Sequence, residues 1–307
     1  MNTEKLFETA RVCGCEILMN EPLAAHTTFK IGGKCIALIE VNSAQSLRRL
    51  LDAAREDRVR TYVLGKGSNV LFDDKGFNGV VLHIASAMSE VKLLGETTIH
   101  AQAGCSLMKL SRFALDNALT GLEFAYGIPG TVGGAVFMNA GAYDGEIKDI
   151  FKGCTAVNLR GEIVKMSAAQ LGFSYRHSVL QETRSIVCDA VFELKKGDRS
   201  QIEAKMNELM GRRKDKQPLE FPNAGSTFKR PEGYFAGKLI QDSGLRGFTV
   251  GGAQVSEKHC GFVINKGGAT ADDVKSLIEQ VQKIVLEKTG QYLECEVRIV
   301  PFEDKES

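Results

Sequence analysis

Residues 127–134 read Gly-Ile-Pro-Gly-Thr-Val-Gly-Gly, the densest run of glycine in a chain of 307 residues that contains 32 glycines. A second glycine-rich turn, Gly65-Lys66-Gly67-Ser68-Asn69, follows the apolar segment 60–64. Glycine lets the backbone approach a ligand closely, and successive N–H groups in such a turn form a concave nest that suits a pyrophosphate. Two such loops between regular elements therefore favour a phosphate-containing ligand.

Neither loop has the dinucleotide fingerprint of a Rossmann fold. The Gly65-x-Gly67 spacing ends in Val70 where that fingerprint has a third glycine, and the P-loop pattern GxxxxGK[ST] is absent. One loop of this kind is more often a turn than a site. The two loops together with a further stretch, residues 27–33 (Thr-Thr-Phe-Lys-Ile-Gly-Gly), are stronger evidence for a binding site than one loop alone.

The segments around the loops alternate between helical and extended patterns. Ser43 is expected to cap a helix with Leu47, Leu50, Leu51 and Ala54 on one face, and a second helix is expected to follow from Ser106. Gly121 is the expected residue after the second helix. Strands are predicted at 60–64, 80–84, 97–101 and 184–194, with a hairpin over 154–166.

The last third of the chain begins with a predicted linker, Lys195–Asp198. Asp198 is expected to cap a helix that buries Ile202, Met206 and Leu209. A second helix starts at a capping-box pattern, Thr270 with Asp273, and ends at Gly290. Its apolar stripe is Val274, Leu277, Ile278, Val281, Ile284 and Val285.

The segment Leu293–Ile299 predicts a strand, because apolar and charged residues alternate strictly along it. Leu293, Cys295, Val297 and Ile299 would face a core, while Glu294, Glu296 and Arg298 would share the opposite face. A solvated sheet face and a functional face both remain possible on these residues alone.

Composition excludes several classes of function. The net charge of +1 gives no electrostatic reason to expect nucleic acid or anionic membrane as a partner. No apolar run is long enough to span a membrane and the N-terminus does not resemble a signal peptide, so we expect a cytoplasmic protein. The eight cysteines form neither a CxxC pair nor a zinc-like cluster, so we expect no metal site and mostly buried free thiols.

Longer motifs identify a family. The chain closely resembles the UDP-N-acetylenolpyruvoylglucosamine reductases (MurB) over nearly its whole length, in the shorter subclass that lacks a tyrosine-bearing loop. The resemblance is carried by residues 27–33, 64–69, 121–135, 138–143, 175–178, 223–228, 236–240, 258–259 and 296–298. The N-terminal motifs alone would imply only the wider group of FAD-binding proteins that includes vanillyl-alcohol-type oxidases.

The resemblance implies an α+β (α/β) architecture. It consists of a two-subdomain FAD-binding module of the vanillyl-alcohol-oxidase-like type, residues 1–85 and 86–196, and a C-terminal α+β substrate-binding domain, residues 197–307. It also implies a cytoplasmic monomer in peptidoglycan precursor synthesis, and hence in cell wall biogenesis, cell shape and cell division. NADPH, as co-substrate, would reduce the enolpyruvyl group of UDP-N-acetylglucosamine enolpyruvate to UDP-N-acetylmuramate through non-covalently bound FAD.

The family's functional residues map onto this sequence by motif. The catalytic residues would be Arg176, Ser226 as proton donor and Glu296. FAD would be bound by Gly65, Lys66, Gly67, Ser68, Asn69, Gly127, Ile128, Pro129, Gly130, Gly133 and Gly134. Substrate contacts would come from Arg213, Lys216, Arg230 and Arg298. Arg230 replaces the family's common asparagine, so its role is open, and a phosphate contact is one option.

The implied chemistry suits these residue types. Adding hydride to the enolpyruvyl methylene carbon builds negative charge at the neighbouring carbon and its carboxylate. A fixed arginine offsets that charge, and the carbanion-like carbon then needs a positioned proton donor. Two other hypotheses stay open: an FAD oxidase that uses oxygen, and a non-enzymatic protein that binds sugar nucleotides.

Overall fold

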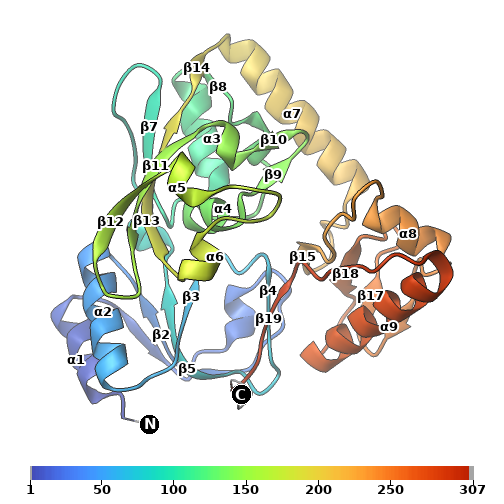
Figure 1. The fold of residues 1–307 in the computed structure, drawn as a ribbon, viewed down its shortest axis with the longest axis horizontal. Coiled ribbons are helices and arrows are strands. Elements are labelled where there is room, and N and C mark those ends of the chain that lie inside the picture. The colour runs from blue at the N-terminus through green and yellow to red at the C-terminus, as the bar shows by residue number, and fades with distance from the viewer. Residues whose placement is uncertain (1, 304–307) are drawn as a thin grey trace. The chain divides into compact units, whose positions relative to one another are not determined.

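The structure is a computed structural model that describes residues 2–303 (Figure 1). It contains mixed helices and sheets, which confirms the predicted α+β class. Its residues group into two compact units. The first contains the residues up to Leu18, 37–66 and 79–212, and the second contains 19–36, 67–78 and the residues from Arg213 onward. The three-domain division with boundaries after residues 85 and 196 stays a prediction.

The first unit begins with two helices, α1 (Glu4–Val12) and α2 (Ala44–Glu56), which contact each other. The predicted cap at Ser43 is confirmed, because its hydroxyl accepts the Ser46 N–H at 3.1 Å. Leu47 and Leu50 are buried as predicted. The neighbouring sheet has the order β1-β2-β5-β3, with bounds Ile17–Met19, Cys35–Glu40, Phe77–His83 and Thr61–Leu64.

This unit also contains a five-stranded sheet in the order β12-β11-β13-β7-β6, of which Figure 1 labels β12, β11, β13 and β7. These strands span Ile163–Ser167, Phe151–Val157, Ile186–Glu193, Thr98–Gln102 and Val91–Leu93. The antiparallel pairing of β11 with β12 confirms the predicted hairpin. The helices are α3 (Leu107–Asp116), α4 (Val132–Met138), α5 (Ala168–Leu171) and α6 (Leu180–Thr183).

The expected role of Gly121 is wrong. Helix α3 ends at Asp116, and Ala118, with φ of 51°, takes the left-handed conformation that follows it. The chain then turns at once into β8 (Leu119–Thr120), because buried Leu119 pairs with β14 (Lys195–Lys196). The other short elements here are η2 (Ser86–Met88), η3 (Glu123–Ala125), η4 (Ile147–Asp149), β9 (Gly141–Ala142) and β10 (Gly145–Glu146).

The helix capped by Asp198 is confirmed as α7 (Arg199–Lys216), along which the chain passes from the first unit to the second. The second unit has a sheet of order β15-β18-β17-β16. Its strands span Asn223–Ser226, Phe262–Asn265, Ala253–Val255 and Thr249–Val250. The turn η1 (Leu23–His26) and the helices α8 (Ala236–Asp242) and α9 (Ala271–Thr289) complete this unit.

One hydrophobic cluster holds the second unit together and includes residues from distant parts of the sequence. Phe29, Ile31 and Leu71 are buried with Val274 and Val281 of α9. The predicted capping box of α9 is confirmed, since Thr270 accepts the Asp273 N–H and Asp273 accepts the Thr270 N–H, both at 3.0 Å. Gly290, with φ of 71°, ends the helix as predicted.

The predicted strand Leu293–Ile299 is only partly correct. Alternation holds for buried Leu293 and Val297, and this stretch bonds to residues 227–229. The regular strand β19 is Arg298–Val300, which pairs in parallel with β4 (Val70–Phe72). This pairing shifts the pattern, so Val300 is buried while Ile299 is 42% exposed.

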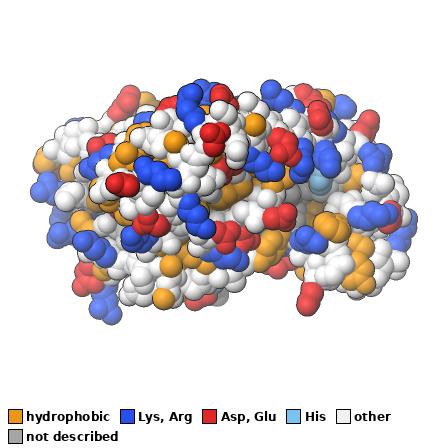
Figure 2. Space-filling view, turned by 90° about the horizontal axis from the view of Figure 1, so that it is seen from above, with side chains coloured by type: hydrophobic (Ala, Val, Ile, Leu, Met, Phe, Trp, Pro, Cys, Tyr) orange, Lys and Arg blue, Asp and Glu red, His pale blue; other side chains and the backbone are white. Residues whose placement is uncertain are grey.

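The surface carries both signs of charge, and Figure 2 shows Lys and Arg side chains interspersed with Asp and Glu. Within residues 2–303, no helix is long and apolar enough to cross a membrane. All eight cysteines are free thiols and six of them are buried, as predicted. Burial raises the pKa of the Cys154 and Cys188 thiols to about 12.

Candidate functional site

The loop 65–69 has the backbone geometry of an anion site. Gly67 adopts a φ of 60°, and a Cβ there would lie 2.3 Å from the His26 carbonyl oxygen, so glycine is required. Among the described residues, no protein acceptor pairs with the N–H groups of Lys66, Gly67, Ser68 and Asn69. Four consecutive donors in a glycine turn fit a diphosphate, so this loop suits FAD.

The loop 127–134 is built differently. The N–H groups of Val132 and Gly133 donate to the carbonyl oxygens of Cys105 and Ala103, each at 2.8 Å. Its glycines serve close packing, because a Cβ on Gly133 would lie 3.0 Å from the Ala103 Cβ. We therefore do not assign these two N–H groups to a phosphate, although the loop as a whole stays a predicted FAD contact.

The two loops meet at Gly65. A Cβ on this residue would lie 2.5 Å from Oγ1 of Thr131, the cap residue of α4. Any side chain at position 65 would therefore push the loops apart. The structure thus brings together two predicted cofactor loops separated by about sixty residues.

Within the second unit, the first glycine loop is bonded to the segment that carries Glu296. The Asn69 amide donates to the Glu296 carbonyl oxygen at 3.1 Å, and the Arg298 N–H donates to the Asn69 carbonyl oxygen at 3.1 Å. Residues 227 positions apart are therefore held together, and Glu296 and Arg298 lie beside the predicted cofactor loop.

Ser226 lies in the same network. The Glu296 N–H donates to the carbonyl oxygen of Thr227, the residue after Ser226, at 2.8 Å. Thr227 is buried, and its hydroxyl accepts the Val263 N–H at 2.9 Å. Gly225, with φ of 77°, lies at the irregular pairing of β15, and the Ser226 side chain is exposed. An exposed hydroxyl on a firmly held backbone is suited to meet a ligand.

Thr28 joins this strand to the glycine loop. Its N–H donates to the Gly67 carbonyl oxygen at 3.1 Å, and its hydroxyl donates to the Asn223 carbonyl oxygen at 2.7 Å. Thr28, in the motif 27–33, thus connects loop 67–69 to the strand of Ser226. The sequence carries the motif but gives no sign of these partners.

Arg176 belongs to the first unit, at the tip of a tight turn closed by Ser174 and His177. It has φ of 56°, its carbonyl oxygen accepts from Gln181, and its guanidinium donates to the Gly141 carbonyl oxygen at 3.1 Å. The guanidinium carbon also lies 5.0 Å from the centre of the Tyr175 ring. The side chain is therefore fixed while half-exposed.

Asn139 is a buried residue beside the Arg176 turn that sequence reasoning did not single out. Its side chain is fully buried and donates to the Ser174 carbonyl oxygen at 2.9 Å, at the base of the Arg176 turn. Its amide oxygen accepts the Lys148 N–H at 3.0 Å. The sequence does not mark this role: the left-handed φ of 43° directly after α4, which asparagine tolerates better than most residues, is visible only in the structure.

The four predicted substrate cations differ in setting. Arg213 and Lys216 lie three positions apart at the C-terminal end of α7. The Arg230 guanidinium lies 3.9 Å from the centre of the Phe235 ring and donates to the Tyr234 carbonyl oxygen. Arg298 is exposed at the start of β19. The Arg230 stack shows how this chain accommodates a residue that departs from the family pattern.

His259 has a defined structural role within the second unit. Its Nδ1 accepts the Gly261 N–H at 3.1 Å, so the proton of the neutral ring is on Nε2. Burial lowers the pKa of this ring and favours that neutral form. The Gly261 carbonyl oxygen in turn accepts the Thr227 N–H, so His259 supports the backbone beside Ser226.

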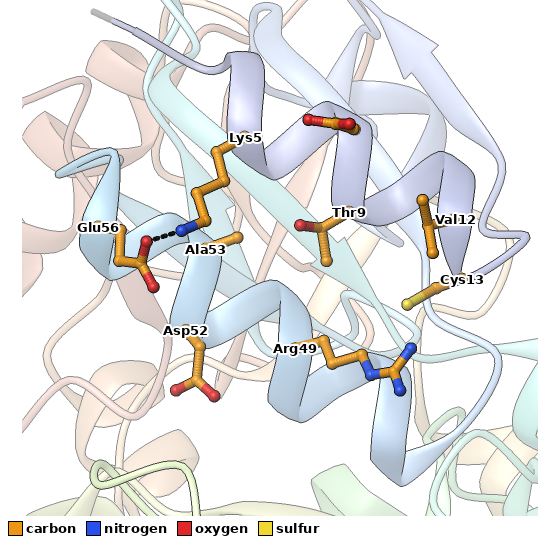
Figure 3. Close-up of a pocket in the computed structure, with 9 residues that line it drawn as sticks. Lys5, Thr9, Val12, Cys13, Arg49, Asp52, Ala53 and Glu56 are labelled. Atoms are coloured by element: carbon orange, nitrogen blue, oxygen red, sulfur yellow. Dashed lines mark hydrogen bonds and ion pairs between the residues drawn. The ribbon is translucent and has the colours of Figure 1, made fainter.

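A surface pocket elsewhere in the first unit does not include these residues. It lies between α1 and α2 and is lined by Lys5, Arg49, Asp52 and Glu56 among others (Figure 3). Lys5 forms an ion pair with Glu56 there. None of the predicted site residues contributes to it, so we assign it no part in the chemistry.

Family models match both parts of the chain. The FAD binding domain model matches residues 36–167, and the model of the UDP-N-acetylenolpyruvoylglucosamine reductase C-terminal domain matches residues 217–300. The combination agrees with the family inferred from the motifs.

Curated relatives cover nearly the whole chain. It is 47% identical over 285 residues to the UDP-N-acetylenolpyruvoylglucosamine reductase of Caldanaerobacter subterraneus, covering 93% of this chain and 94% of the relative. It is 47% identical over 304 residues to the protein of that name from Lachnoclostridium phytofermentans, covering 98% of both.

Solved structures agree. The MurB structure from Thermus caldophilus aligns with a TM-score of 0.79 at 34% identity, over 94% of this chain and 99% of that one. A variant of the BBE-like 1 protein from Physcomitrella patens aligns with a TM-score of 0.50 at 16% identity, over 62% of this chain and 44% of its own. The second likeness concerns the fold alone.

Proposed function

This chain belongs to the UDP-N-acetylenolpyruvoylglucosamine reductase (MurB) family of FAD-dependent oxidoreductases, and we propose that it reduces the enolpyruvyl group of UDP-N-acetylglucosamine enolpyruvate with NADPH. The product would be UDP-N-acetylmuramate, for peptidoglycan precursor synthesis. One observation carries the proposal beyond the family name: hydrogen bonds join loop 67–69 to Glu296 and, through Thr28, to the strand of Ser226.

The loop 66–69 is the proposed seat of the FAD diphosphate. Its four N–H groups would donate to phosphate oxygens, and the Lys66 ammonium adds positive charge beside them. FAD, when bound, supplies the redox chemistry between NADPH and the enolpyruvyl group. The protein's residues then have three tasks: to orient the substrate, to offset charge and to deliver a proton.

Arg176 would offset the negative charge that develops on the substrate. The Gly141 carbonyl and the Tyr175 ring hold its guanidinium in place, so little reorganisation is needed when the charge appears. A planar guanidinium also matches a carboxylate with two parallel hydrogen bonds. This is the role that the family motif implies for it.

Ser226 would donate the proton to the carbon next to the new C–H bond. Serine is a weak acid, so it suits this task only because the acceptor is strongly basic. Its hydroxyl is exposed, while Thr227 fixes the backbone beside it on two sides. Glu296, tied to the same Thr227, would orient or polarise the intermediate.

The cations Arg213, Lys216, Arg230 and Arg298 would bind the acidic parts of the substrate. Arg230 is already ordered by the Phe235 ring, so it loses little freedom on binding a phosphate. We also propose that the protein acts as a cytoplasmic monomer. Light scattering of the purified protein tests the monomer.

The visible spectrum tests the reaction directly. Under anaerobic conditions, NADPH should bleach the flavin absorbance, and the enolpyruvyl sugar nucleotide should restore it rapidly. Reoxidation by air alone should be slow. Rapid recovery in air with no response to the sugar nucleotide would instead identify an oxidase, and a protein that cannot be reconstituted with FAD would contradict the proposal altogether.

A further inference from the structure

His83 lies at the end of β5, between a carboxylate and the start of the first glycine loop. Its Nδ1 is 2.6 Å from Oε1 of Glu40, the last residue of β2. Its Nε2 is 3.1 Å from the carbonyl oxygen of Gly65, the residue after β3. The side chains of His83 and Glu40 are only 12% and 21% exposed. Three strand ends therefore meet at one shielded ring.

The hydrogen-bonding pattern fixes one proton of this group and requires a second. The Gly65 carbonyl can only accept, so Nε2 must carry a proton. The contact with Glu40 needs a second proton, either on Nδ1 facing a carboxylate or on the carboxyl facing Nδ1. In the first form both bonds are charge-assisted, which makes them stronger than bonds between neutral groups.

Gly65 is the point through which this group reaches both cofactor loops. On one side its carbonyl is held by His83, and the pairing of Leu64 with His83 keeps the two strands in register. On the other side its α-carbon packs against the Thr131 hydroxyl at the base of α4. The next four residues carry the N–H groups that have no protein acceptor within residues 2–303.

We propose that Glu40 and His83 are positioning residues for FAD, which fix the Gly65 carbonyl and so hold loop 65–69 in the conformation that binds the cofactor. Neither residue contacts the cofactor in this scheme. The inference rests on the proposed assignment of this loop to FAD, but it is independent of which substrate the reduced flavin serves.

FAD affinity is the direct test. The apoprotein of His83→Phe keeps a ring of similar size but has neither ring nitrogen, so it should bind FAD about 10- to 100-fold more weakly in ultrafiltration titrations. His100→Phe is the matched control. His100 is in β7 of the same unit, 3.5 Å from Asp189 and 19% exposed, and within residues 2–303 its side chain forms no hydrogen bond to either glycine loop. It should keep wild-type affinity.

A pair of substitutions at Glu40 separates hydrogen bonding from packing. In Glu40→Gln the side-chain amide can donate to Nδ1, while the proton stays on Nε2 and faces the Gly65 carbonyl oxygen. The affinity for FAD should therefore stay within about 3-fold of wild type. Glu40→Leu cannot do this and should resemble His83→Phe. If His83→Phe does not fold, the comparison of Glu40→Gln with Glu40→Leu still tests whether this group positions the FAD loop.

Two results would overturn the inference. One is wild-type FAD affinity in folded His83→Phe or Glu40→Leu. The other is an equal loss in Glu40→Gln and Glu40→Leu, which would mean that the site responds to packing alone. Because these titrations contain neither NADPH nor sugar nucleotide, a failure of the proposed reaction would leave their outcome unchanged.

Discussion

Replacing Asn139 should weaken catalysis through a residue that is not itself catalytic. Asn139→Gly keeps the left-handed backbone at this position, since glycine adopts it freely, and removes only the amide. The Ser174 carbonyl and the Lys148 N–H then lose their partner. Both hydrogen bonds are only part-buried, so water can reach the two groups left without a partner, and we expect about 1–3 kcal/mol of lost stability in total.

The effect on rate follows from the Arg176 turn. Arg176 keeps its hydrogen bonds to Gly141 and Gln181 in this variant. Its guanidinium therefore remains in the site but is less well aligned. Deleting one preorganised charge-stabilising group costs on the order of 10²–10³ in rate. We therefore expect a smaller loss, about 10- to 100-fold, in the half-reaction that reduces the enolpyruvyl group. Flavin reduction by NADPH should change little, because no substrate carboxylate is involved.

Stopped-flow flavin absorbance separates the two half-reactions, and urea unfolding gives the stability. Asn158→Gly is the matched control, since Asn158 also holds a tight turn by accepting the N–H groups of Arg160 and Glu162. It should lose stability without losing rate. A wild-type rate for the second half-reaction in Asn139→Gly, or equal slowing of both halves, would refute the positioning role.

Three other predictions concern the site and the fold. Ser226→Ala should leave flavin reduction by NADPH nearly unchanged and slow the second half-reaction by roughly 10²–10⁴-fold. Ser226→Cys should recover part of the rate of that half-reaction. If the same stopped-flow assay shows equal slowing of both half-reactions, the serine only shapes its loop. Arg176→Ala and Glu296→Gln should keep FAD bound but lower turnover on the order of 10²–10³-fold, and near wild-type steady-state turnover in either would remove that residue from the mechanism. Bonds from the Thr270 and Gly252 N–H groups lower the pKa of the Asp273 carboxyl, so its stabilising effect is present above the ordinary aspartate pKa and is lost as the pH falls through the lowered value. Urea unfolding from neutral to acidic pH should therefore show a steeper loss for wild type than for Asp273→Asn, and parallel curves would contradict this.

The sequence alone was sufficient for the local elements with strong end signals. Ser43 and Thr270 each cap a helix as predicted, because capping depends on side chains within three residues of the helix start. The family followed from the order and spacing of long motifs. The same locality explains the errors at Gly121 and Ile299, where pairing with distant strands determines the backbone.

The arrangement of the candidate site was decided by tertiary structure. No local pattern shows that Asn69 bonds to Glu296, that Thr28 bridges Gly67 and Asn223, or that His83 reaches Gly65. Nor does the glycine content of residues 127–134 show that the N–H groups of Val132 and Gly133 are used inside the protein. A hydrogen bond depends on positions within about 3 Å in space, whereas sequence patterns record only neighbours along the chain. The sequence therefore determined which residues carry the chemistry, and the fold determined which partners hold them in place.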